Sequence, residues 1–153
     1  MFRGLEIIQR NDGTAGGTRS IYLKNAANIT ILDCTFVGGT NSYYGVYMDT
    51  GEGLAISSSK FLDFGKFAVY IYYASYIIVS NNIFRDCYVA VHIAGMGRDV
   101  YGVVAGNVIY YTHDFATDTA ILVGGISRHV AILGNVFDTS SNDAPCIEVQ
   151  GQG

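Results

Sequence analysis

The sequence repeats one short phrase along its whole length, and this repeat constrains the fold more than any other feature. The phrase is an aliphatic residue, any residue and a second aliphatic residue, followed by a polar or small residue two positions before Phe or Ile. Its first residues are Leu5, Ile29, Leu54, Ile77, Gly102 and Val130, which are 24, 25, 23, 25 and 28 residues apart. A steady period of this length is typical of a solenoid, in which each repeat buries its apolar side by stacking on its neighbours.

A second strand follows a turn in every repeat. It is centred on triplets whose two outer residues are apolar, namely 21–23, 46–48, 69–71, 91–93, 121–123 and 147–149. Alternate residues of a strand face opposite sides, so the outer two residues of each triplet point inward and the middle one outward. A short third strand is expected around Phe36, Phe61, Phe84, Ile109 and Phe137. We predict an all-β, single-stranded parallel β-helix of about six coils that forms one domain over residues 1–153.

A column of small and polar residues lies two positions before the residue at the centre of the third strand. It consists of Cys34, Ser59, Asn82, Asn107 and Asn135. Asparagine side chains carry both donors and acceptors, so stacked copies can hydrogen-bond from coil to coil and satisfy the backbone of a buried turn. We therefore expect an asparagine ladder on this side of the core.

Two of the repeats also carry a family resemblance. The phrase Asn28-Ile29-Thr30-Ile31 with Cys34-Thr35-Phe36, and its echo over 76–84, resemble the repeats of the pectate-lyase-like superfamily of right-handed parallel β-helices. The resemblance covers nearly the whole chain and implies a right-handed coil. The superfamily includes polysaccharide lyases, hydrolases, epimerases and phage tail-spike proteins, so the resemblance implies a fold and no single activity.

Composition limits the possible partners. The formal net charge is −4 and 14% of the residues are charged, against about 25% in ordinary soluble proteins. Nothing here points to nucleic acid or to a membrane as a partner, since no apolar run reaches the roughly 20 residues of a membrane span. The three cysteines occupy different positions of the repeat and are expected to be reduced packing residues. We expect no cofactor and no metal.

The outward column of the second strand holds the candidate ligand-binding residues. It begins with Tyr22, Tyr47, Tyr70 and His92, and beside it the small residues Ser20, Gly45, Ala68, Ala90, Ala120 and Cys146 are expected to form a flat floor. Aromatic rings stack on the apolar faces of sugars, so this arrangement favours a saccharide. Tyrosine is also common on exposed strands for its own sake, and a lone strand histidine is more often inert, which makes His92 the weakest member.

Catalytic candidates are few. The enzymes of this superfamily that cleave uronic-acid polymers rely on clustered aspartates. The paired Asp-Asp, Gly-His-Gly and Arg-Ile-Lys signatures of its hydrolases are absent from the sequence. Asp63 and Asp86 follow the third strand on adjacent coils, so their backbones should lie about 5 Å apart, which suits the acid pair of a retaining glycosidase. The pair could equally recruit Lys66, Arg85 or a cation, and aspartate is a common turn residue. A second candidate is the long turn 110–118, which contains His113 and Asp114.

The outer side of the first and third strands is unusually apolar. It carries Ile8, Leu32, Ile78, Val103, Ala131 and Leu133, together with Ile83, Val108 and Val136. A contiguous apolar outer surface indicates a partner, so a homo-oligomer is expected, with a trimer as one form. The coils also lack capping helices, and we expect the chain to be a fragment of a longer protein or part of an assembly.

The function that this sequence favours is carbohydrate binding by a β-helix domain of an extracellular or virion-associated protein, similar to a tail-spike. Two alternatives stay open. One is a polysaccharide lyase or glycoside hydrolase acting on an acidic polysaccharide, with Asp63 and Asp86 near the chemistry. The other is a structural spacer without catalysis.

Overall fold

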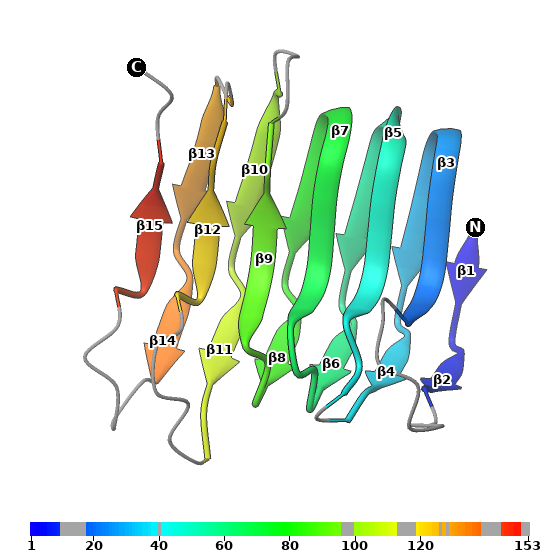
Figure 1. The fold of residues 1–153 in the computed structure, drawn as a ribbon, viewed down its shortest axis with the longest axis vertical. Coiled ribbons are helices and arrows are strands. Elements are labelled where there is room, and N and C mark those ends of the chain that lie inside the picture. The colour runs from blue at the N-terminus through cyan, green and yellow to red at the C-terminus, as the bar shows by residue number, and fades with distance from the viewer. Residues whose placement is uncertain are drawn as a thin grey trace.

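A computed structural model describes residues 1–9, 18–39, 41–95, 100–112, 119–125, 127, 129–138 and 145–150. These residues form parallel β-strands joined by turns, wound into a solenoid (Figure 1). Among them no helix is long and apolar enough to cross a bilayer.

The first sheet is built on three long strands that each bend in the middle. They are β3 (Arg19–Leu32), β5 (Tyr44–Ser57) and β7 (Phe67–Ser80), with β1 (Phe2–Arg3) beside β3. Beyond β7 the two halves continue as separate strands. The front half in Figure 1 continues as β9 (Val89–Ile93), β12 (Ile121–Val123) and β15 (Ile147–Val149), and the back half as β10 (Gly102–Ala105) and β13 (Val130–Leu133).

A second sheet of short strands closes the solenoid at the bottom of Figure 1. Its members are β2 (Glu6–Ile8), β4 (Thr35–Val37), β6 (Lys60–Leu62), β8 (Ile83–Arg85), β11 (Val108–Tyr110) and β14 (Val136–Asp138). All recorded pairings in both sheets are parallel. The chain therefore passes through three walls in each coil, as the three strand segments of the repeat predict.

The register confirms every predicted anchor except the first. Ile29, Leu54, Ile77, Gly102 and Val130 are partners on successive coils.

Leu5 does not join this column. Phe2 pairs with Ile31, and Ile7 pairs with Phe36, so Leu5 stands at the turn position that Cys34 occupies in the next coil. The alternation Leu5-Glu6-Ile7 fits both the first and the third strand of the repeat. The prediction that it forms the first strand is wrong, because Glu6–Ile8 pairs in the second sheet. The solenoid has about five turns instead of six, and Ile8 belongs to the second sheet.

The core is a set of stacked columns. Ile31, Ile56, Val79 and Val104 are fully buried one above another. Phe36, Phe61 and Phe84 form a parallel ring stack with centroids 4.6 and 5.1 Å apart. Dry aliphatic and aromatic columns of this kind bury apolar area between coils, which is the main source of stability in a fold without a central helix or disulfide.

The predicted asparagine ladder is present. The side-chain oxygen of Asn107 accepts the backbone N–H of Asn82 at 3.0 Å, and that of Asn135 accepts the backbone N–H of Asn107 at 3.0 Å. The Asn107 amide also donates to the Val79 carbonyl at 3.0 Å. Ser59 continues the ladder toward the N-terminus, where its hydroxyl accepts the backbone N–H of Cys34 at 3.1 Å.

The cysteines agree with the prediction that they are packing residues, since none of the three forms a disulfide. Cys34 and Cys87 are buried. Burial raises the pKa of the Cys87 thiol to about 12, so this side chain stays protonated and unreactive at neutral pH.

Candidate functional site

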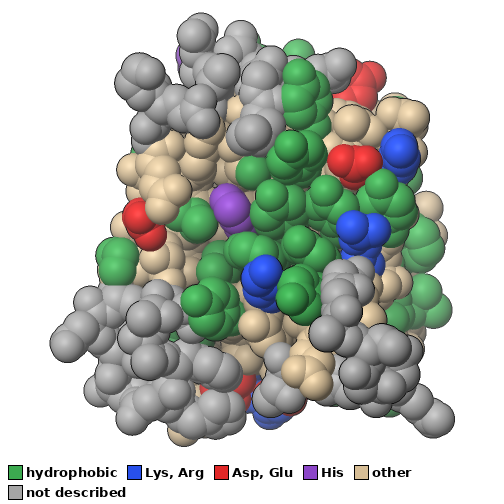
Figure 2. All heavy atoms as spheres, viewed as in Figure 1, with side chains coloured by type: hydrophobic (Ala, Val, Ile, Leu, Met, Phe, Trp, Pro, Cys, Tyr) green, Lys and Arg blue, Asp and Glu red, His purple; other side chains and the backbone are tan. Residues whose placement is uncertain are grey.

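The tyrosine column lies on the front wall of the solenoid, as predicted. Tyr22, Tyr47, Tyr70 and His92 are partners on successive coils, and Leu122 and Glu148 follow them. From Tyr22 to Leu122, each stands between two buried apolar residues of its strand, which forces its side chain outward. Figure 2 shows hydrophobic side chains, tyrosine included, gathered on this side of the molecule, with charged side chains among and around them.

A second row of rings lies against the first, and the sequence analysis missed it. Tyr44 and Phe67 are partners on adjacent coils. The Tyr44 ring lies 4.9 Å from that of Tyr47, and the Phe67 ring lies 5.0 Å from that of Tyr70. We define the aromatic face as Tyr22, Tyr44, Tyr47, Phe67, Tyr70, Tyr72 and His92.

The predicted floor of small residues is wrong. Ala68, Ala90 and Ala120 are completely buried, and a Cβ added to Gly45 would lie 2.6 Å from the Ala68 carbonyl oxygen and 3.1 Å from the Phe61 and Phe64 rings. Two consecutive residues, such as Gly45 and Val46, are buried where the chain enters this wall, so strict alternation fails there. Gly45 is small because its backbone is packed against the two phenylalanines.

The rings are also oriented differently from a flat platform. Tyr22 and Tyr47 are stacked, with centroids 5.4 Å apart and planes at 19°, whereas Tyr70 is tilted by 43° from Tyr47 and by 85° from the His92 ring. Stacked rings turn their faces toward each other, so Tyr22 and Tyr47 present mainly ring edges and hydroxyl groups to solvent.

Arg19 adds a positive charge at the edge of the aromatic face. The carbon of its guanidinium lies 4.6 Å from the ring centroids of both Tyr22 and Tyr47 and 5.8 Å from that of Tyr44. This is cation–π distance, and the contact places the guanidinium against both rings.

Packing and hydrogen bonding shift the pKa of several groups of the aromatic face toward the neutral form. The Tyr22 hydroxyl donates to Asp49 at 2.8 Å, which raises the pKa of Tyr22. Burial raises the pKa of Tyr70 to about 12 and lowers the pKa of His92 to about 4. His92 Nδ1 is buried and has no hydrogen-bond partner among the described residues. The face thus presents phenol hydroxyls and a neutral imidazole.

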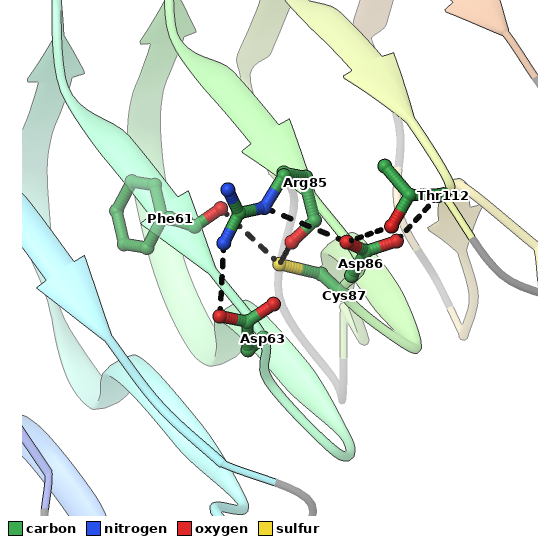
Figure 3. A network of polar contacts seen from close by, with 6 residues as sticks. All are labelled: Phe61, Asp63, Arg85, Asp86, Cys87 and Thr112. Atoms are coloured by element: carbon green, nitrogen blue, oxygen red, sulfur yellow. Dashed lines mark hydrogen bonds and ion pairs between the residues drawn. The ribbon is translucent and has the colours of Figure 1, made fainter.

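Asp63 and Asp86 are brought together around Arg85, one of the partners that the sequence analysis named (Figure 3). Arg85 Nη2 lies 3.0 Å from Asp63 Oδ2, and Arg85 Nε lies 3.5 Å from Asp86 Oδ2. Asp86 also accepts hydrogen bonds from the backbone N–H of Thr112 at 2.6 Å and from its hydroxyl at 2.8 Å.

This arrangement is that of a turn-stabilising network. Both aspartates have positive φ, 62° for Asp63 and 52° for Asp86, a conformation that aspartate tolerates better than most residues. Asp86 is 3% exposed, and both of its carboxylate oxygens are engaged. A catalytic role for the pair stays a prediction, and the geometry does not favour it because a nucleophile or acid must reach the substrate.

His113 and Asp114 of the long turn lie outside the described residues. Within the described ranges no group of three or more His, Cys, Asp or Glu side chains is arranged to hold a metal ion.

A second aromatic stack lies on the back wall, and it was also missed. Tyr76, Tyr101 and His129 stack with centroids 5.5 and 4.9 Å apart, and both tyrosines are exposed. Each directly precedes an anchor of the repeat, so the period alone could have revealed it. Tyr76 and His129 have φ values of 57° and 58°, which are rare for bulky residues.

The predicted apolar outer surface is exposed in part. Ile78, Val103 and Leu133 on the back wall and Val108 and Val136 on the second sheet are exposed, whereas Leu32, Ile83 and Ala131 are half-buried. Ile78, Val103 and Ala131 are partners on successive coils. Ile8 of the second sheet is also exposed, so the exposed aliphatic side chains lie in both halves of the described chain.

Comparison with known proteins agrees with this architecture. The family described as "Right handed beta helix region" matches residues 7–153. No curated protein and no solved structure matches the chain.

Proposed function

The chain belongs to the right-handed β-helix family, and we propose that it acts as a carbohydrate-binding domain of an extracellular or virion-associated protein of the tail-spike type. The observation that carries this proposal is the aromatic face. It spans four successive coils, from Tyr22 to His92, and coils about 4.8 Å apart give it a length of about 14 Å along the solenoid axis.

The chemistry of this face suits a sugar chain. Ring edges and partly open ring faces cover the apolar C–H patches of a pyranose, and uncharged phenol groups donate and accept hydrogen bonds with sugar hydroxyls. Tyr47 and Tyr70 supply neutral phenol groups, whereas the Tyr22 hydroxyl already donates to Asp49 and is left as an acceptor.

Binding without catalysis is the version that the geometry supports. The Asp63–Asp86 pair is bridged by Arg85, and Asp86 is buried. We therefore propose binding as the function and keep lyase or hydrolase activity as the alternative.

A panel of neutral and acidic polysaccharides tests the proposal. Retention of the protein and release of new reducing or unsaturated ends should be measured together. We expect retention on at least one polysaccharide and no release of ends. Tyr47→Ala and Tyr70→Ala should each lower the affinity about fivefold, which corresponds to about 1 kcal/mol per aromatic contact.

The matched control is Tyr101→Ala, which removes an exposed tyrosine from the back wall and should leave the affinity unchanged. Equal affinity of the wild type and both front-wall variants would show that the aromatic face is not the site. New ends released by the wild type, and lost in Asp63→Asn, would support the enzymatic alternative instead.

Self-assembly is a second proposal, supported by the exposed aliphatic residues Ile78, Val103 and Leu133 on the back wall. A homo-oligomer formed through this wall would leave the aromatic face on the opposite, front wall open to ligand. The two proposals are therefore compatible.

A further inference from the structure

A polar hollow lies on the outer side of the solenoid, at the bend of the three long strands. Its volume is about 310 Å³, and it is lined by Asn25, Ala26, Ala27, Thr50, Gly51, Glu52 and Tyr73. Sites for small molecules usually measure about 300–1,000 Å³, so a hollow of this size suits a single sugar ring better than a chain.

The hollow is held open by local hydrogen bonds. The Thr50 hydroxyl accepts the backbone N–H of Asn25 at 2.9 Å and donates to the Asn25 side-chain oxygen at 2.8 Å. Asn25 has a φ of 51°, which turns the strand at this point. A Cβ at Gly51 would overlap the Ala26 carbonyl oxygen, so the backbone of adjacent coils can approach only because glycine stands there.

A row of rings connects the hollow to the aromatic face. Tyr70 and Tyr72 stack at 6.3 Å with planes at 16°, and the Tyr72 ring lies 6.4 Å from that of Tyr73, which lines the hollow. This row runs along β7, across the direction of the tyrosine column. A saccharide lying on the aromatic face therefore has a continuous path of tyrosines that ends in the hollow.

The charge at the two ends of this surface is opposite. Glu52 is exposed and is the one charged side chain among the residues that line the hollow. Arg19 lies over Tyr22 and Tyr47 at the other end of the front wall. A sugar in the hollow meets a carboxylate with amide and hydroxyl groups beside it, which attracts an amine and repels a uronic acid.

We propose that the hollow is the subsite for an amino sugar at the end of the bound saccharide, with Glu52 facing its ammonium group. This inference rests on the proposed carbohydrate-binding function. An exposed ion pair contributes about 0.2–1 kcal/mol, so the preference for an amino sugar over its N-acetylated form should be about 1.4- to fivefold and should weaken with added salt.

The test is calorimetric titration with oligomers of glucosamine, N-acetylglucosamine and galacturonic acid of equal length, below neutral pH so that the amine is protonated. We expect the glucosamine oligomer to bind most tightly and the galacturonic acid oligomer least. Glu52→Gln should abolish the advantage of glucosamine over N-acetylglucosamine without weakening the N-acetylated oligomer. The control Glu6→Gln, which removes the same charge from an exposed residue of β2, should keep the advantage.

The outcomes separate the two proposals. If no polysaccharide of the panel and none of the oligomers binds the wild type, the proposed function fails and the amino-sugar subsite fails with it. If saccharides bind and Tyr47→Ala weakens them, but glucosamine shows no advantage or Glu52→Gln preserves it, the subsite is overturned while the function stands.

Discussion

Among single side chains, His92 shows how packing on the front wall disfavours the charged form of a residue. Its ring is 4.9 Å from that of Tyr70 and 5.1 Å from that of Phe67. Burial between these rings disfavours the imidazolium and lowers the pKa of His92 from 6.5 to about 4. A histidine on the outside of a strand is thus half-buried here, because Phe67 of the second row of rings packs against it.

The shifted pKa of His92 predicts a loss of stability in mild acid. Between about pH 6.5 and pH 4 the unfolded chain binds a proton at His92 and the folded chain does not, so the free energy of unfolding falls as the pH falls. The contribution should be about 1–3 kcal/mol and fully present above pH 6.5. Urea unfolding at several pH values measures it.

His92→Leu provides the comparison for this prediction, because the next coil carries Leu122 at the same position. The variant should lose less stability than the wild type on acidification to about pH 4. Parallel pH profiles of the two proteins would mean that His92 is not responsible.

At the scale of strands, the sequence predicts whatever depends on strict alternation and misses what depends on bends and ring angles. The register from Ile29 to Val130 and the asparagine ladder follow from inward positions that recur every 23–28 residues. Gly45 and Ala68 were assigned outward because the alternation was extended through the point where the chain enters the front wall. The tilt of Tyr70 depends on three-dimensional packing, which a list of positions does not contain.

Disruption of the asparagine ladder should lower the free energy of unfolding strongly, because its hydrogen bonds are buried. Asn107→Ala would leave the backbone N–H of Asn82 and the carbonyl of Val79 without their partners inside the core. Leaving a buried polar group unpaired costs about 1–3 kcal/mol, so the free energy of unfolding should fall by about 2–4 kcal/mol. Chemical denaturation measures this loss.

Asn135→Ala is the control for the ladder prediction. Asn135 is half-buried in the last described coil of the ladder, where water can replace its hydrogen bonds, so the loss should be smaller. Equal losses at both positions, or a loss below about 0.5 kcal/mol for Asn107→Ala, would contradict this view of the ladder.

At the scale of the whole molecule, the two walls of the first sheet differ in character. The front wall carries tyrosines and the back wall carries the Tyr76–Tyr101–His129 stack with exposed aliphatic residues beside it. Replacing Ile78, Val103 and Leu133 by lysine should shift the mass in solution toward that of a monomer, because like charges would face each other across the interface. Light scattering measures the mass.

Glu6→Lys, a charge reversal at an exposed residue of the second sheet, should leave the mass unchanged. The proposal of assembly through the back wall fails if the wild type already has the mass of a monomer. It also fails if the triple variant keeps the oligomeric mass of the wild type.

The parallel register has one more consequence, for how such a surface can be redesigned. Coils repeat about every 4.8 Å along the axis, and outward residues recur about every 6.6 Å along a strand, so the outward residues of the front wall lie on a regular grid. The steps between anchors vary from 23 to 28 residues without shifting the columns, because the turns absorb the difference. A side chain can therefore be exchanged at one position of this grid, and a turn can be lengthened, without changing the strand pairing of the other coils.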